Sequence, residues 1–392
     1  MIYPFIFLIS SIVWADTPNC QAVDKNAPFD VYLITSGPGQ SIYSRIGHSA
    51  LWVSGGNKDN AFFNWGAYDS KQENFIWHFF LGTANYKLSL MSEKRNMRIA
   101  TTENRIVKAQ HLNLSPEMKI RLQRKLLIQA KPKNRSYLYH WETQNCSTLI
   151  RDIINISAGF PWENLKEDQT TISRRDEVLR HLSSLKWAWF GWNFMGSSYA
   201  ERHYTKWELM HIPENLMIQA SDTKILWEDG STQPLVDYEC ILHDSPTGWA
   251  PTKPPTRWPW LWGWGIMLSG LIIKGFKSSK RWISLSSKLF LSTHFLFSGL
   301  LGSFFGYLWL NSSLEGYGPN ENWFYSNPIS IGLLFVIWKQ NQIGKSILWL
   351  SLLIAIMGII SNLFTTQINL GFIGLFGLPI IAISYLFLLP QK

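Results

Sequence analysis

Charged residues are almost absent from the last third of the chain, and this absence constrains the fold more than any other feature. From residue 291 onward the only charged side chains are Glu315, Glu321, Lys339, Lys345 and Lys392. A water-soluble surface cannot be built from so few charges. The C-terminal third is therefore predicted to lie in a membrane, whereas the N-terminal half is polar enough to fold in water.

Five apolar stretches predict membrane-spanning helices, roughly at residues 258–273, 289–310, 323–338, 346–364 and 368–389. The second, fourth and fifth approach the ~20 residues that cross the hydrocarbon core. The first and third are shorter and have tryptophan-rich flanks that suit the headgroup level. If the N-terminal domain is exported, the basic loops fall inside and the acidic loop outside, in agreement with the positive-inside rule. We therefore predict a transmembrane bundle of about five spans.

The N-terminus predicts export of the domain that follows it. An apolar run over residues 2–13 ends in Val13-Trp14-Ala15, which resembles a signal-peptide cleavage site. No Lys or Arg precedes the run, so an uncleaved anchor is the alternative. The predicted organisation is a signal peptide at 1–15, an extracytoplasmic domain at 16–244, a proline-rich connector at 245–257 and a transmembrane domain at 258–392.

The net charge of +9 does not indicate nucleic-acid binding. Four of the cations, Lys274, Lys277, Lys280 and Arg281, lie together in a loop between two apolar stretches, where the positive-inside rule places them. The others form no basic stripe and no RNA-binding aromatic motif. The membrane is therefore a predicted partner, and nucleic acid is not.

Three cysteines in an exported chain leave one without a partner. Cys20 and Cys240 lie near the two ends of the predicted extracytoplasmic domain, where a disulfide would close it in an oxidising compartment. Cys146 would then be a candidate reactive thiol. A buried packing cysteine is the alternative.

The N-terminal half reads as a mixed α+β domain. Residues 30–35, 44–53 and 61–68 are rich in β-branched and aromatic residues and predict strands. Residues 114–130 predict a helix, with Ser115 as N-cap and Pro116 in its first turn. A further helix is predicted to begin at Asn145.

This last helix places Cys146 in a first turn, where free backbone N–H groups and the helix dipole stabilise a thiolate. An imidazole nearby would exchange the thiol proton. His48 is the best candidate, because small residues flank it in the β-rich Gly-His-Ser-Ala sequence and leave room for a substrate. A hydrogen-bonded structural histidine is the alternative.

Several sequence strings carry a family resemblance. These are YSRIGHSALWV, NWGAYD, YLYHWETQNCSTLIRD, WFGWNFMG and KWELMHIPENLM, and the resemblance extends over roughly residues 28–240. The region resembles the N-terminal extracytoplasmic domain of Lnb-type lipoprotein intramolecular transacylases. The order of histidine before cysteine is also similar to circularly permuted papain-like proteins such as lecithin:retinol acyltransferase.

The resemblance implies an α+β permuted papain-like domain in a bacterial cytoplasmic membrane protein, with a thiol acyltransferase reaction and no cofactor. Its substrate would be a diacylglyceryl lipoprotein or a phospholipid. Cys146 would be the nucleophile, His48 the general acid and base, and Asn64 the residue that orients the imidazole, unless Asn64 is only a turn or edge residue. Arg45, Arg151 and Ser147 are candidates for binding the polar head of the substrate, with surface arginines as the alternative for the first two.

Two other functions stay open at this point. One is a papain-like cell-wall amidase or endopeptidase that uses the same cysteine and histidine, although such hydrolases rarely need several membrane spans. The other is a non-catalytic membrane assembly module with an inert Cys146. A metalloenzyme is disfavoured, because no two histidines have the spacing of metal ligands.

Overall fold

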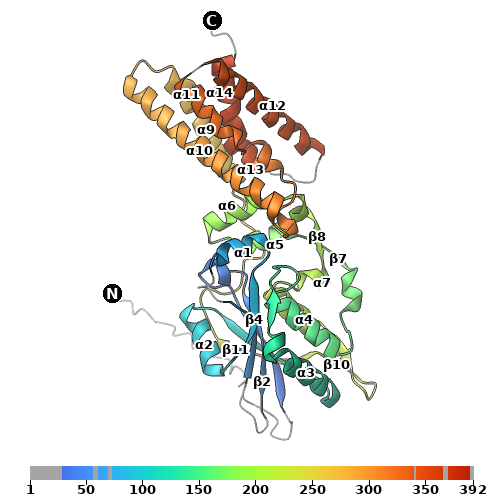
Figure 1. Ribbon diagram of the computed structural model, residues 1–392. Helices are drawn as coiled ribbons and strands as arrows, with labels where there is room; N and C mark the ends of the chain where they lie inside the picture. Colours follow the sequence, from blue (N-terminus) through green and yellow to red (C-terminus); the bar gives the residue numbers. More distant parts are fainter. Residues whose placement is uncertain (1–28, 56–60, 69–72, 340, 365–369, 389–392) are drawn as a thin grey trace, which may run out of the picture.

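The computed structural model describes residues 29–55, 61–68, 73–339, 341–364 and 370–388, so the predicted signal peptide and Cys20 lie outside the described residues. Figure 1 shows an N-terminal domain built on a sheet and, beyond it, a C-terminal bundle of helices. Helices α1 and α6 lie between the two (Figure 1).

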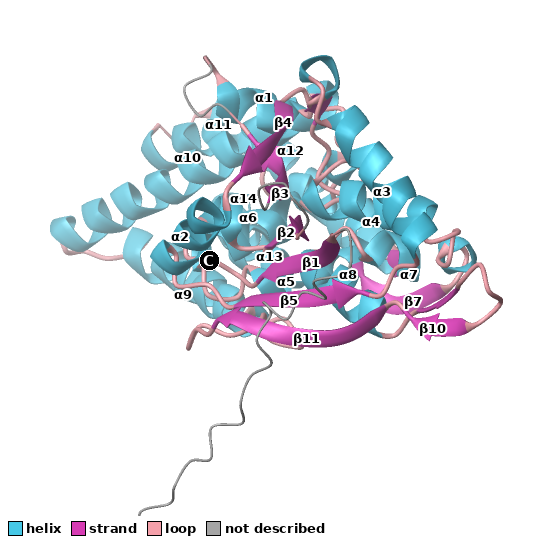
Figure 2. Ribbon diagram, turned by 90° about the horizontal axis from the view of Figure 1, so that it is seen from below, coloured by secondary structure: helices cyan, strands magenta, loops and turns pink. Residues whose placement is uncertain are grey.

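One seven-stranded sheet is the frame of the N-terminal domain. Its strand order is β11-β5-β1-β2-β3-β4-β6, and every adjacent pair is antiparallel. Figure 2 shows the order from β11 to β4 across the sheet. The strands are β1 (Asp30–Ser36), β2 (His48–Ser54), β3 (Ala61–Ala67), β4 (Asn85–Met91), β5 (Val107–Leu112), β6 (Ser136–Leu138) and β11 (Val236–His243).

Eight helices and four short strands complete the described part of this domain. The helices are α1 (Phe75–Leu81), α2 (Glu93–Thr102), α3 (Pro116–Gln129), α4 (Cys146–Ser157), α5 (Arg174–His181), α6 (Lys186–Met195), α7 (Lys206–Leu209) and α8 (Pro213–Ser221). The short strands are β7 (Gln169–Ser173), β8 (His203–Thr205), β9 (Lys224–Leu226) and β10 (Thr232–Pro234).

Strand β1 is buried along its whole length because helices cover both faces of the sheet. Val31 and Leu33 point into a core shared with α3 and α4. Tyr32 and Ile34 point into a second core on the opposite face, which includes Ala100 of α2. Figure 2 shows α3 and α4 on one side of the sheet and α2 on the other. Alternate side chains of a strand point to opposite faces, so both cores draw on one apolar segment.

The C-terminal bundle consists of apolar helices around a core of aliphatic and phenylalanine side chains. The helices are α9 (Trp258–Phe276), α10 (Arg281–Asn311), α11 (Ile329–Trp338), α12 (Gln342–Phe364), α13 (Leu370–Phe372) and α14 (Leu378–Leu388). Within the described residues, two helical segments are long and apolar enough to cross a membrane, Arg281–Asn311 and Gln342–Ser361. The five-span arrangement remains a prediction.

The local sequence signals agree with most of the observed boundaries in the N-terminal domain. Ser115 caps α3, since its side chain accepts a hydrogen bond from Met118 N (3.2 Å), and Pro116 is the first helical residue. The predicted strand at 44–53 begins later, at His48. A 3₁₀ turn precedes it, and Gly47 has a φ of 94°, so the chain is not extended there.

The loop between α10 and α11 hydrogen-bonds to the carboxyl end of α1. Ser312 Oγ donates to Phe80 O (2.8 Å), and Ser313 N donates to Leu81 O (3.1 Å). Gly82 ends α1 with a φ of 72°, and a Cβ there would lie 2.4 Å from Ser313 Oγ. Carbonyls at a helix end have no intrahelical donor. The membrane half of the chain supplies these donors and thereby fixes α1.

The same loop caps α6. Asn320 Nδ2 donates to Phe194 O and to Met195 O (2.7 Å each), and Asn322 Nδ2 donates to Phe194 O (3.0 Å). The Phe194 ring lies 5.1 Å from the ring of Phe372 in the bundle. Two helices of the N-terminal domain are thus held by one loop of the C-terminal half.

Reporter fusions test the predicted orientation of the helices. A reporter active only outside the cytoplasm should work after Ser313, and a cytoplasmic reporter should work after Lys277 and after Gln342. The reason is that the basic loop residues are retained inside. A cytoplasmic signal at Ser313 would contradict the five-span arrangement.

Candidate active site

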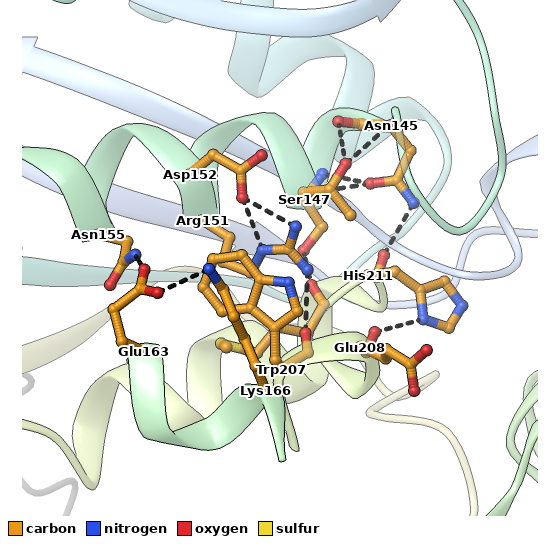
Figure 3. A network of polar contacts seen from close by, with 12 residues as sticks. Asn145, Ser147, Arg151, Asp152, Asn155, Glu163, Lys166, Trp207, Glu208 and His211 are labelled. Atoms are coloured by element: carbon orange, nitrogen blue, oxygen red, sulfur yellow. Dashed lines mark hydrogen bonds and ion pairs between the residues drawn. The ribbon is translucent and has the colours of Figure 1, made fainter. Parts of the chain in front are cut away.

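The side chain of Asn145 determines where α4 begins. Its Oδ1 accepts hydrogen bonds from Ser147 N (2.8 Å) and Thr148 N (2.9 Å), and Thr148 Oγ1 accepts one from Asn145 N (2.9 Å). Its Nδ2 donates to Trp141 O (2.7 Å) and His211 O (3.0 Å). Figure 3 shows Asn145 between Ser147 and His211. This capping box makes Cys146 the first residue of the helix.

Cys146 is a free, partly exposed thiol surrounded by backbone donors. Burial raises its pKa above the ordinary value for a thiol. The N–H groups of Ser49, Ser147 and Cys146 itself and the positive charge of Arg105 act in the opposite direction. The thiol is therefore protonated at neutral pH and needs a base to become a nucleophile.

His48 is held by Asn64. The His48 Nε2 and the Asn64 Oδ1 are 3.1 Å apart. An amide oxygen only accepts, so Nε2 carries the proton and Nδ1 is the basic nitrogen. Burial and the charge of Arg105 lower the pKa of His48 to about 4, against the hydrogen bond to Asn64, which raises it. At neutral pH the imidazole is a neutral base.

Gly66 lies next to both His48 and Cys146. A Cβ at this position would lie 3.9 Å from His48 Cε1 and 4.0 Å from Cys146 Cβ, so one residue is in van der Waals range of both side chains. Gly66 has a φ of 105°, and the pairing of β3 with β4 is irregular between Asn64 and Ala67. This bulge, which favours glycine, carries β3 past the candidate site.

The sequence alone does not identify Arg105 as a residue of the candidate site. It is buried, its Nε donates to Gly37 O (2.8 Å) and its Nη1 lies 3.6 Å from the Glu103 carboxylate. Its charge acts on both Cys146 and His48, favouring the thiolate and disfavouring the imidazolium. No local motif marks Arg105, because the fold brings it to the site from a distant part of the chain.

Three tyrosines form an aromatic wall beside the thiol, and we refer to Tyr86, Tyr137 and Tyr139 as the tyrosine wall. Burial raises the pKa of each phenol, and Cys146, when ionised, raises it further in each case. The rings of Tyr86 and Tyr139 stack with centroids 4.3 Å apart. The sequence shows residues 137–141 as an aromatic run, but it does not show which side chains face the cysteine.

The loop before α4 is anchored by a buried carboxylate. Glu142 Oε1 accepts from Arg174 Nη1 (2.8 Å) and from Tyr204 OH (2.9 Å), and Glu142 Oε2 accepts from Tyr199 OH (2.5 Å). These bonds satisfy a charge that would otherwise be costly to bury. Glu142 thus positions the turn that leads to Asn145.

The side chains of two expected substrate-binding residues are engaged elsewhere. Arg151 bonds to Asp152 Oδ1 (2.9 Å) and Trp207 O (3.0 Å), and its guanidinium stacks 3.7 Å from the Trp207 ring centroid (Figure 3). Ser147 is fully buried, and its Oγ donates to Met210 O (2.7 Å). Neither residue is part of the function proposed below.

Arg45, the third expected substrate-binding residue, is also buried. Its Nη2 donates to Ser184 Oγ, and its Nε has no hydrogen-bond partner among the described residues. Burial lowers its pKa. A role for Arg45 in substrate binding stays a prediction.

Cys240 is disulfide-bonded. Its expected partner, Cys20, lies outside the described residues, so the pairing itself remains a prediction. In the parts of the chain that the structure describes, no group of three or more His, Cys, Asp or Glu side chains could hold a metal ion.

Comparison with known proteins identifies the N-terminal part of the chain. Residues 19–177 match the family model described as the Lnb N-terminal periplasmic domain. No curated protein and no solved structure matches the chain. Together with the long apolar helices, the match indicates a membrane protein with an extracytoplasmic N-terminal domain. The papain-like permutation remains a prediction.

Asn145→Ala should destabilise the protein more than Ser115→Ala, the loss of the cap of α3. Removing a helix cap costs about 0.5–2 kcal/mol. Asn145→Ala also leaves two carbonyls without their donor, whereas Ser115 makes a single capping bond. Thermal unfolding of both full-length variants in detergent measures this, and an equal loss would contradict the role assigned to Asn145.

The alkylation rate of Cys146 by iodoacetamide should rise steadily with pH and keep rising above about pH 9, because the pKa of the thiol is raised. Arg105→Gln removes a charge that favours the thiolate, so its rate at pH 7 should fall by about tenfold. Arg98→Gln changes an exposed arginine of α2 and is the control. An alkylation rate that reaches its plateau below neutral pH would mean that Cys146 is a thiolate and His48 an imidazolium in the resting protein.

Proposed function

Residues 19–177 belong to the Lnb N-terminal periplasmic domain family, whose description suggests a part in lipoprotein modification, and from this premise we propose that the chain is a membrane-bound thiol acyltransferase. The observation that carries the proposal is the cluster of Cys146, His48 and Asn64. A cysteine at a helix start, an imidazole that shares Gly66 with it as a neighbour and an amide bonded to one ring nitrogen resemble the Cys-His-Asn arrangement of papain-like enzymes.

In the first step the Cys146 sulfur attacks an ester carbonyl of the diacylglyceryl group on a lipoprotein's N-terminal cysteine. The S–C bond forms as the ester C–O bond breaks. His48 Nδ1 takes the thiol proton and returns it to the departing glycerol oxygen. The acyl chain is then held as a thioester. A neutral imidazole next to a protonated thiol is the starting state that this proton transfer requires.

In the second step the free amine of the same lipoprotein cysteine attacks the thioester. The N–C bond forms, the S–C bond breaks and His48 moves the amine proton to the departing thiolate. The product is an amide, and the enzyme returns to its starting state with no cofactor consumed.

Backbone N–H groups are available to stabilise the oxyanion of each step. Those of Ser49 and Cys146 point to the sulfur from β2 and from the start of α4. In this proposal they receive the carbonyl oxygen as it becomes negative. Arg105 adds a positive charge from behind the site without contacting the substrate.

The position of the site beside the bundle favours a lipid substrate over a cell-wall peptide. Trp141, whose carbonyl accepts from Asn145, lies next to the loop after α10, and a Cβ on Gly316 would be 3.7 Å from its ring. Its ring also lies 4.9 Å from that of Trp192 in α6. A cell-wall hydrolase has no need to pack the loop before its nucleophile against a membrane bundle.

Variants of the three cluster residues test the proposal through the mass of lipoprotein N-termini. Cys146→Ala should abolish transfer of an acyl chain from glycerol to amine, since no other group carries the thioester. Cys146→Ser should be nearly inactive, because the imidazole cannot ionise a hydroxyl comparably. His48→Ala should lose about 10²–10⁴-fold, and Asn64→Ala should lose less than either.

Arg124→Gln is the control for these variants, since it changes an exposed arginine of α3 outside the cluster. Each variant is first shown to be folded by its thermal transition. Full activity in a folded Cys146→Ala protein would refute the mechanism, and the non-catalytic module would then be the better account.

A further inference from the structure

Helix α1 is apolar and yet incompletely buried. Its sequence, Phe75 to Leu81, contains no Asp, Glu, Lys or Arg, and none of its side chains is fully buried. Ile76 is 71% exposed and Trp77 is 37% exposed. An exposed apolar helix is unfavourable in water and is typical of a segment that lies in the headgroup region of a membrane.

The depth of α1 relative to the membrane can be inferred from its contact with α10. Between Lys288 and Asn311, α10 has no charged side chain, a stretch of about 33 Å at 1.5 Å per residue. This matches the ~30 Å hydrocarbon core, so the last turns of α10 lie at the headgroup level. Trp77 meets those turns, with its ring 5.2 Å from Tyr307 and 6.3 Å from Phe304. Ribbons of α1 and the end of α10 lie close together in Figure 1.

From α1 a row of aromatic rings leads to the thiol. Phe80 lies 5.7 Å from Phe304 of α10, and Phe79 lies 6.1 Å from Phe80. Phe79 in turn stacks on Tyr139 at 5.8 Å. Tyr139 stacks on Tyr86 of the tyrosine wall, with ring centroids 4.3 Å apart, and lies in the segment that leads to Cys146. The row therefore runs from a candidate membrane span to the residues just before the candidate nucleophile.

We propose that α1 is an interfacial helix and that Phe79, Phe80 and Tyr139 line the route by which a long acyl chain reaches the Cys146 thiol. The inference rests on the proposed acyl transfer and names the surface that receives the chain. A hydrocarbon chain offers no hydrogen bonds and gains by contact with half-buried rings, whereas a peptide or sugar strand would leave its polar groups unpaired on the same surface.

Alkyl methanethiosulfonates test this route without requiring any acyl transfer. The Cys146 thiolate attacks the reagent's sulfenyl sulfur, an S–S bond forms, methanesulfinate leaves, and the protein mass increases by the alkylthio group. The rates of the methyl and tetradecyl reagents are measured on the full-length chain in one detergent. Their ratio, tetradecyl over methyl, reports how well the surroundings of the thiol accept a chain.

We expect this ratio to be about tenfold lower in Phe79→Ser and in Phe80→Ser than in the unaltered chain, because each variant removes one apolar contact of the chain. Phe79→Leu should keep the ratio within about twofold, since leucine preserves an apolar surface. Leu127→Ser changes an exposed apolar residue of α3, far from the row, and should also keep it. The comparison cancels partition of the longer reagent into detergent.

An unchanged ratio in both serine variants, with normal reactivity toward the methyl reagent, would overturn the route even if acyl transfer were established. If one serine variant fails to fold, the other decides. Conversely, a lowered ratio would support the route, and the proposed function is judged separately by the lipoprotein masses of the Cys146→Ala protein.

Discussion

The side chain of Asn145 joins the parts of the molecule that the proposed chemistry needs. One of its ends caps α4 and thereby fixes the backbone around Cys146. Its other end holds the carbonyls of Trp141, which packs toward the bundle, and of His211, which precedes α8. All of its hydrogen-bonding groups are used, and the residue is buried. An amide is the side chain that can accept at one end and donate at the other.

The sheet supplies the remaining geometry around this fixed point. His48 is the first residue of β2, and Asn64 holds its ring from β3. The bulge at Gly66 keeps β3 close to the side chains of both Cys146 and His48. Burial leaves the resting pair neutral, because it raises the pKa of Cys146 and, together with the charge of Arg105, lowers the pKa of His48. A neutral pair suits a site at a membrane surface, where separated charges are costly to desolvate.

Features encoded by neighbouring residues could be predicted from the sequence. The start of α4 at Cys146, the cap of α3 at Ser115 and the strands around residues 30–36 and 61–67 each depend on local propensity and capping. The hydrogen bond between His48 and Asn64 agrees with the orienting role expected for Asn64. That role and the catalytic roles themselves are still untested.

Features that depend on long-range packing could not be read from the sequence. Arg105 reaches the site from the segment before β5, and nothing in its local sequence distinguishes it from a surface arginine. From the sequence, Arg151 is a candidate substrate ligand. In the structure its guanidinium stacks on the Trp207 ring and donates to the Trp207 carbonyl. Likewise the aromatic row through α1 depends on contacts between segments far apart in the sequence, among them the hydrogen bonds from Ser312 and Ser313 to the end of that helix.

Trapping the acyl-enzyme tests the central claim most directly. The full-length protein is incubated with a diacylglyceryl lipopeptide whose amine is dimethylated, so that it donates an acyl chain but cannot accept one. The account predicts that mass spectrometry will find the acyl group on the peptide containing Cys146, and that neutral hydroxylamine will remove it as expected for a thioester. An unmodified Cys146 in a preparation that converts the same lipopeptide with a free amine would contradict the thioester mechanism.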